Sequence, residues 1–185
     1  MLFVHFNHHT EAYIMMMRSQ SLRRVLPLFA ILCMTLLPVG NGRADPPAGY
    51  TFLRYDEGLR IAKRDGKRVF AYFGRYGCGF CDKTNKESFS NTEIRKLYTE
   101  HYVLVYVDAE SGRRLQLPSG ETITEMELGA MMKTLVTPYF LFLEPDGHVI
   151  HKAPGFQTVQ SFLEFDRYIH GGHYKNQTLS QFLVK

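Results

Sequence analysis

The sequence predicts an α/β fold in which helices flank a central mixed sheet, and three observations support this prediction. Two continuous apolar runs, at residues 68–73 and 102–107, have the composition of strands that are covered on both faces. Segments with helical periodicity separate these runs. Near the C-terminus, two further apolar segments flank Glu144-Pro145-Asp146-Gly147, which has the composition of a tight turn. We therefore expect a sheet that is parallel in its first part, with an antiparallel edge.

The expected elements of the first half alternate between strand and helix. In chain order they are a short strand at residues 50–54, a helix at 55–64, a buried strand at 67–74, a helix at 82–89 and a helix that runs to Tyr98. Asp65-Gly66 is expected to end the first helix, because glycine readily adopts the left-handed conformation found at helix C-termini. Ser90-Asn91-Thr92-Glu93 matches a capping box, with the Ser90 hydroxyl as the N-cap of the next helix.

The expected second half ends in the hairpin and one more helix. Its elements are a buried strand at 102–107, a polar loop at 109–122, a helix from Thr124 to Leu135, strands at 139–143 and 148–151, and a helix at 158–169. Thr124 and Glu127 form a second capping-box pattern, so a helix is expected to begin there. Five apolar residues of this helix are available for the core, namely Met126, Leu128, Met131, Met132 and Leu135. Thr137-Pro138 interrupts the pattern before the next strand.

Residues 1–44 are interpreted as an N-terminal extension and a secretory signal peptide, and residues 45–185 as one domain. Three arginines precede an apolar stretch, which is followed by the small residues Gly42 and Ala44 that suit a signal-peptidase site. The stretch is shorter than the roughly twenty residues that a membrane helix needs. We therefore expect cleavage after Ala44, export to the periplasm and no stable membrane insertion of the mature protein. A retained N-terminal anchor is the alternative.

The charge of the chain does not indicate a nucleic-acid partner. The formal net charge is +4, of which four arginines and Glu11 in the leader account for +3, so the remaining chain carries +1. A nucleic-acid-binding domain usually has a marked excess of basic residues on one face. We therefore predict that the protein does not bind nucleic acid.

Cys78-Gly79-Phe80-Cys81 is the segment that points most directly to a chemical function. Its cysteines are the only ones outside the leader, and they lie where a strand is expected to give way to a helix. Thiolates attack disulfides, and unpaired N–H groups at a helix N-terminus stabilise a thiolate. We place Cys78 in the first helical turn, where Arg75 and Lys83 add positive charge, and expect its pKa to fall from about 8.5 to about 7. Cys81, one turn later, is expected to be buried and to resolve a mixed disulfide formed at Cys78.

Two other interpretations of the cysteine pair stay open at this point. A purely structural disulfide is one, although closing so short a loop adds little stability through chain entropy. A metal site is the other, but the histidines after residue 100 do not supply a second ligand pair at the usual spacing. His170-Gly171-Gly172-His173 comes nearest to such a pair, and we expect it to be a surface loop. We predict no metal and no cofactor.

Two separated motifs make the chain resemble the thioredoxin superfamily. The first is the strand, C-x-x-C and helix around Cys78, and the second is Pro138, a later proline that opens a strand. The resemblance covers residues 50–170. Within the superfamily, exported thioredoxin-like proteins of the SoxW type are similar in the active-site segment and in the Gly-Gly-His-Tyr sequence at 171–174.

The resemblance implies a thioredoxin-like fold with a cis proline before an antiparallel strand, and protein thiols and disulfides as partners. In the superfamily this proline packs beside the disulfide, which implies a cis bond before Pro138. It also implies that the backbone of Thr137 hydrogen-bonds an extended substrate segment, and that Phe80 lies on the shallow apolar surface around it. A simple helix stop at Pro138 is the alternative. The SoxW-type resemblance implies a reductant that receives electrons from a membrane thiol transporter and serves sulfur oxidation or cytochrome maturation.

The chain departs from cytoplasmic thioredoxins around the cysteines. Gly77 stands in place of their tryptophan, and Phe80 in place of their proline. Tyr72 occupies the position of their buried aspartate, so the proton acceptor for Cys81 is unassigned. Water and Glu87 are the candidates.

Two further functions stay open from the sequence. Cys-Gly-Phe-Cys is close to the Cys-Gly-Tyr-Cys of periplasmic disulfide isomerases, which favours an oxidase or isomerase. Those proteins, however, carry an added dimerisation domain that this sequence lacks. The cysteines are also suitable soft ligands for a chaperone of a copper or haem pathway.

Overall fold

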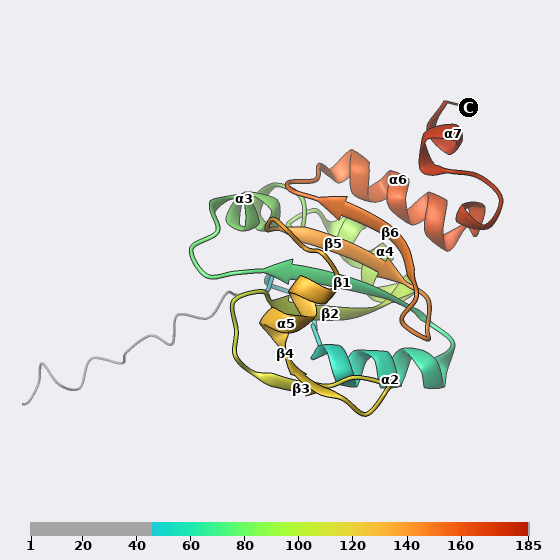
Figure 1. Cartoon of the computed structure of the whole chain (residues 1–185). Helices are drawn as coiled ribbons and strands as arrows, with labels where there is room; N and C mark the ends of the chain where they lie inside the picture. The colour runs from blue at the N-terminus through green and yellow to red at the C-terminus, as the bar shows by residue number, and fades with distance from the viewer. Residues whose placement is uncertain (1–45, 185) are drawn as a thin grey trace, which may run out of the picture. The chain divides into compact units, whose positions relative to one another are not determined.

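The two long apolar runs form adjacent parallel strands in the computed structural model, which describes residues 46–184 (Figure 1). The strands lie in the order β2-β1-β5-β6. Their bounds are β1 (Arg68–Gly74), β2 (Tyr102–Asp108), β5 (Tyr139–Leu143) and β6 (Val149–Pro154). β1 is parallel to β2 and antiparallel to β5, and β6 is antiparallel to β5. The predicted mixed sheet with an antiparallel edge is confirmed.

Helices alternate with these strands and cover both faces of the sheet (Figure 1). They are α2 (Tyr55–Asp65), α3 (Gly79–Glu87), α4 (Thr92–His101), α5 (Glu125–Met131), α6 (Val159–His170), the 3₁₀ helix η1 (His173–Lys175) and α7 (Leu179–Leu183). Gly66 ends α2 in the left-handed conformation, as predicted. None of the helices within residues 46–184 combines the length and the hydropathy needed to span a membrane.

The side chains of β1 alternate between two buried layers, which explains why its sequence is apolar throughout. Phe70 points to the face covered by α4 and α6, where its ring packs against Tyr98 and Phe162. Ala71 points to the opposite face, which α2 and α5 cover and where Leu128 of α5 is buried. Both cysteines belong to the layer that contains Phe70, so the sheet positions the cysteine pair directly.

Two predictions about the first half of the chain are wrong in detail. The strand expected at residues 50–54 is reduced to a single parallel bridge between Leu53 and Val105. The N-cap of α4 is Asn91 rather than Ser90. The Asn91 side-chain oxygen accepts hydrogen bonds from two N–H groups of the first helical turn, whereas the Ser90 hydroxyl donates to a carbonyl of the preceding helix.

The polar segment at 109–122 contains a hairpin where the sequence predicted only a loop. Its strands are β3 (Arg114–Gln116) and β4 (Thr122–Thr124), and they pair antiparallel. Leu115 is buried, while its two neighbours in β3 are exposed. A single apolar residue in a three-residue strand gives too short an alternation to be recognised in the sequence.

α5 begins where predicted but ends sooner. The Thr124–Glu127 capping box is present, and the helix stops at Met131 instead of continuing to Leu135. Leu128 is buried, but Met126, Met131 and Leu135 are at least half exposed, so their assignment to the core is wrong. A helix of two turns directs only one row of side chains at the sheet, and the others face solvent.

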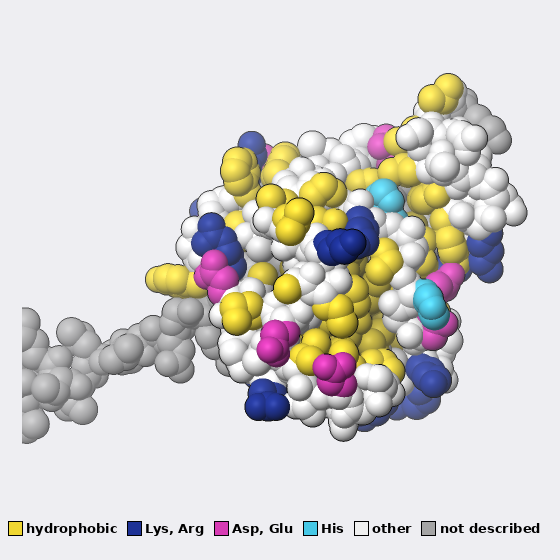
Figure 2. All heavy atoms as spheres, in the orientation of Figure 1, with side chains coloured by type: hydrophobic (Ala, Val, Ile, Leu, Met, Phe, Trp, Pro, Cys, Tyr) yellow, Lys and Arg dark blue, Asp and Glu magenta, His cyan; other side chains and the backbone are white. Residues whose placement is uncertain are grey.

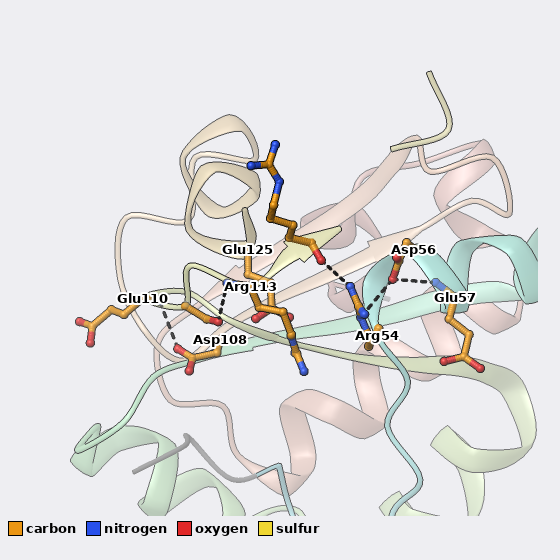
Figure 3. Close-up of polar contacts among 9 residues, drawn as sticks. Arg54, Asp56, Glu57, Asp108, Glu110, Arg113 and Glu125 are labelled. Atoms are coloured by element: carbon orange, nitrogen blue, oxygen red, sulfur yellow. Dashed lines mark hydrogen bonds and ion pairs between the residues drawn. The ribbon is translucent and has the colours of Figure 1, made fainter. Parts of the chain in front are cut away.

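A buried ion pair joins the hairpin to α5 (Figure 3). The Arg113 guanidinium donates to the carboxylate of Glu125, whose side chain is only 1% exposed. Two backbone hydrogen bonds join the same two segments. The N–H of Glu125 donates to the Arg113 carbonyl at 3.0 Å, and the N–H of Met126 donates to the Ser111 carbonyl at 3.1 Å. These contacts fix the start of α5, and therefore the segment that leads from α5 to Thr137.

Candidate active site

A disulfide joins Cys78 and Cys81 at the junction between β1 and α3. The Cα atoms of the two cysteines are 5.2 Å apart. Gly77 precedes them with a φ of 66°, a left-handed conformation that glycine adopts without a steric penalty. The chain can therefore turn sharply out of the strand and enter the helix at Cys78.

Cys78 is the N-cap of α3, one position before the first turn in which the sequence placed it. Its Sγ atom accepts a hydrogen bond from the backbone N–H of Cys81 at 3.1 Å. This N–H is one of the unpaired donors at the helix N-terminus, where the helix dipole favours negative charge. Both cysteines are 6% exposed, so the predicted burial extends to Cys78 as well as Cys81.

Thr137 and Pro138, in the segment between α5 and β5, lie against the disulfide. The peptide bond between them is cis, and Pro138 is buried. The Thr137 hydroxyl donates to Cys78 Sγ at 3.4 Å, and the Thr137 carbonyl oxygen also lies 3.4 Å from that sulfur. The fold thus brings the two motifs of the sequence together at a single atom.

Phe80 lies between the cysteines and is 65% exposed, which fits a residue on a contact surface. The structure adds exposed apolar residues that the sequence reasoning missed. We call them, together with Phe80, the apolar rim: Tyr76, Phe80, Met126, Met131, Leu135 and Val136. They belong to two segments that meet at the contact between Cys78 and Thr137, and Figure 2 shows hydrophobic side chains at the surface over α5. The position of Leu135-Val136 directly before Thr137-Pro138 was the available sequence signal.

Tyr72 is fully buried in the same layer as the cysteines. Its hydroxyl donates to Oδ1 of Asn85, at 3.3 Å, one helical turn after Cys81. Burial raises the pKa of Tyr72 far above its ordinary value, with smaller contributions from Tyr106 and Asp82. The phenol is therefore neutral at physiological pH and acts as a hydrogen-bond donor. Glu87, the side chain considered as proton acceptor for Cys81, is exposed on α3.

The two cations expected near Cys78 are directed to other partners. Arg75 lies 3.5 Å from Glu110, and the Lys83 ammonium group lies 4.5 Å from the centre of the Phe156 ring. The helix N-terminus and Thr137 therefore supply the polar contacts recorded at Cys78.

Histidines and carboxylates do not gather into a metal site in the described part of the chain. Within residues 46–184, no group of three or more His, Cys, Asp or Glu side chains is arranged to hold an ion. His170 stacks on His101 with ring centres 3.5 Å apart, whereas His173 stacks on Phe182. The two histidines of the 170–173 sequence thus have different neighbours.

Comparisons with solved structures agree with this fold. A thioredoxin-fold protein from Helicobacter pylori is 22% identical, with a TM-score of 0.57 over 65% of this chain and 81% of that one. A thioredoxin from Thermus thermophilus is 24% identical, with a TM-score of 0.55 over 68% and 92%. A putative disulphide isomerase from Bacteroides thetaiotaomicron is 21% identical, with a TM-score of 0.52 over 68% and 97%.

The family model of the thioredoxin-like domain matches residues 55–170, from the start of α2 to the end of α6. The match includes the cysteine pair and the Thr137–Pro138 bond that faces it. The chain therefore belongs to the thioredoxin-like family and is a thiol–disulfide oxidoreductase with Cys78 and Cys81 as its cysteine pair.

Proposed function

We propose that this protein is a periplasmic reductant of the SoxW type, which transfers two electrons from its cysteine pair to disulfides in other proteins. The observation that carries the thiol-exchange part of the proposal is the environment of Cys78 Sγ, which receives the Cys81 N–H at 3.1 Å and the Thr137 hydroxyl at 3.4 Å. Both donors stabilise negative charge on the sulfur once the disulfide is reduced. The direction of electron flow rests on the resemblance of the sequence to SoxW-type proteins.

In the proposed reaction, the Cys78 thiolate attacks one sulfur of a substrate disulfide. A mixed disulfide forms between Cys78 and that sulfur, and the other substrate sulfur leaves as a thiolate that takes up a proton. The Cys81 thiol then loses its proton and attacks Cys78 Sγ, which releases the second substrate thiol and forms the Cys78–Cys81 disulfide. The substrate gains two electrons and two protons. The cysteine pair loses two electrons and the Cys81 proton, and the second proton comes from solvent, which took up the Cys78 proton when that thiol ionised.

The substrate is proposed to be an extended protein segment that lies along Thr137 and Pro138. The neighbourhood of Cys78 supports this, because the Thr137 backbone runs past the sulfur and Phe80 exposes its ring beside it. The apolar rim supplies further contact surface, since exposed patches of large apolar side chains commonly mark interaction sites. Contact through backbone and apolar groups suits a reaction that must accept more than one sequence.

The periplasmic location and the electron donor are proposed from the sequence. The predicted leader supports export and cleavage after Ala44, a position outside the described residues. A reductant in an oxidising compartment needs a supply of electrons from the cytoplasm. We propose a membrane thiol transporter as that supply, and a sulfur-oxidation or cytochrome-maturation protein as the recipient.

The reduction potential of the Cys78–Cys81 pair tests the direction of electron flow. Equilibration with glutathione or dithiothreitol buffers should give a value below the about −180 mV of protein disulfide isomerase. A potential near about −120 mV, typical of the DsbA oxidase, would contradict the reductant and favour the oxidase or isomerase. The copper-chaperone alternative is tested separately, by titrating the reduced protein with Cu(I), and a stoichiometric tight complex would favour it.

A further inference from the structure

A second concave site lies at the end of the sheet opposite the disulfide. A cavity of about 550 Å³ opens between α2, the turn of the β3–β4 hairpin and the turn between β5 and β6. The end of β5 pairs with the start of β1, through Leu143 and Val69, whereas Cys78 follows the other end of β1. The cavity is therefore separate from the cysteine pair, and thiol exchange does not use it.

The walls of the cavity are largely apolar. Leu59 from α2, Leu117 and Pro118 from the hairpin and Pro145 from the β5–β6 turn line it. In Figure 2, hydrophobic side chains are visible in a hollow between the hairpin and the β5–β6 turn. A volume of this size lies within the range of about 300–1,000 Å³ that is typical of small-molecule sites.

Hydrogen bonds hold the two turns that frame the cavity in place. In the hairpin, the N–H of Leu117 donates to the Glu121 carbonyl at 2.8 Å, and the N–H of Gly120 donates to the Leu117 carbonyl at 2.9 Å. In the β5–β6 turn, the N–H of Gly147 donates to the Glu144 carbonyl at 2.9 Å, and the N–H of Glu144 donates to the His148 carbonyl at 2.8 Å. The site is thus formed before any ligand enters.

Two cations from α2 lie at this cavity without an ionic partner. Arg60 and Lys63 both line it and are exposed, and their spacing of three residues places them on one face of the helix. Among the ion pairs of residues 46–184, none includes either side chain. Their charges are therefore available to a ligand.

The two acidic residues at the cavity already have partners. Asp56 lies 3.4 Å from the Arg54 guanidinium (Figure 3). Asp146 accepts a hydrogen bond from the backbone N–H of His148 at 3.1 Å and lies 3.0 Å from its ring, and these hydrogen bonds lower the pKa of Asp146. The charged residues of the lining therefore sum to zero, but both carboxylates have partners, whereas Arg60 and Lys63 have no ionic partner within residues 46–184.

We propose that this cavity binds a small organic anion with an apolar body, whose acidic group pairs with Arg60 and Lys63. The apolar body contacts Leu59 and Leu117, and the two cations without an ionic partner favour an anion over a neutral molecule of the same shape. Carboxylates and sulfonates share this chemistry. The site is independent of the proposed redox function.

Titration with decanoate, below its micelle concentration and at low ionic strength, tests the proposal. We expect saturable binding, with amide NMR shifts confined to α2 and to residues 116–120 and 145–148. The double variant Arg60→Ala/Lys63→Ala should weaken binding about three- to tenfold, as expected for two partly exposed ion pairs. Leu117→Asp, which places a negative charge on the wall, should weaken it at least as much.

Arg64→Ala is the control for a general loss of charge, because it removes one positive charge from α2 at a position that is paired with Asp65 and does not line the cavity. It should leave decanoate binding unchanged, and the neutral analogue decanamide should bind more weakly than decanoate. Equal losses for Arg64→Ala and the double variant would overturn the proposal, as would NMR shifts centred on the apolar rim. The absence of saturable binding would also overturn it. None of these outcomes bears on the activity of the cysteine pair.

Discussion

Cys78 Sγ lies where a helix N-terminus and the Thr137 side chain converge. The N–H of Cys81 is a donor that every helix offers at this point, whereas the Thr137 hydroxyl belongs to a side chain that can be replaced. The Thr137 hydroxyl therefore allows the environment of a single sulfur to be changed without altering the helix.

Thr137→Val should slow the reaction of Cys78 with iodoacetamide at pH 7, measured in a Cys81→Ala background. We expect a decrease of about three- to tenfold, because a long hydrogen bond to a charged sulfur contributes about 1 kcal/mol. Thr134→Val is the control. The Thr134 hydroxyl lies in the same segment between α5 and β5, but it donates to the Gly129 carbonyl. Equal rates for Thr137→Val and the parent would show that the hydroxyl does not stabilise the thiolate.

His151 should make the protein less stable in acid. Burial against Phe165 and Phe142 lowers the pKa of His151 below its ordinary value of about 6.5. The unfolded chain therefore binds a proton more readily than the folded one, and stability falls as the pH drops through 6.5 towards the folded pKa. His151→Leu should reduce the loss of unfolding free energy between pH 7.5 and pH 5.5 in urea titrations. An unchanged pH dependence would contradict this assignment.

At the scale of elements, the β3–β4 hairpin and α5 are joined into one unit that leads into the active site. The Arg113–Glu125 pair and two backbone hydrogen bonds join them, and α5 leads into the segment that ends at Thr137. This part of the chain was the least well predicted. Glu125 was not recognised as buried, because a glutamate in the first turn of a helix usually faces solvent.

Glu125→Leu should destabilise the fold by about 2–4 kcal/mol, because it leaves the Arg113 charge partly buried without its partner. The double variant Arg113→Leu/Glu125→Leu should recover part of this loss, since neither charge is then left alone. Chemical denaturation of both variants measures the difference. A single variant as stable as the parent would mean that the ion pair does not fasten the hairpin to α5.

The apolar rim should affect protein substrates and not small ones. Replacing Met131 and Leu135 together by serine should raise the KM for reduction of insulin about three- to tenfold, since the two changes together remove apolar contacts worth about 1 kcal/mol. The rate with a small disulfide such as hydroxyethyl disulfide should not change, because it needs only the cysteines. Ala130→Ser, at an exposed position of α5, is the control. A parallel loss with both substrates would indicate damage to the cysteine site instead.

At the scale of the molecule, the sequence was sufficient to predict the sheet and the location of the cysteine pair. The continuous apolar runs of β1 and β2 and the turn at Glu144–Gly147 determined the topology, and the C-x-x-C segment and Thr137-Pro138 determined the two walls of the site. Apart from Phe80, the apolar rim was not predicted, because Met126, Met131 and Leu135 were assigned to the core on the basis of an expected longer helix. The cavity at α2 depends on packing between three separate segments, which no local pattern records.

The two sites lie at opposite ends of the sheet, and only the cysteine site has a family-wide chemistry. The central claim is therefore the division of roles within the cysteine pair, with Cys78 attacking and Cys81 resolving. Incubation of the reduced Cys81→Ala variant with insulin tests it most directly. Mass spectrometry should reveal a stable mixed disulfide through Cys78, and the Cys78→Ala variant should form none. Accumulation of the adduct with Cys78→Ala, and not with Cys81→Ala, would reverse the roles and contradict the account.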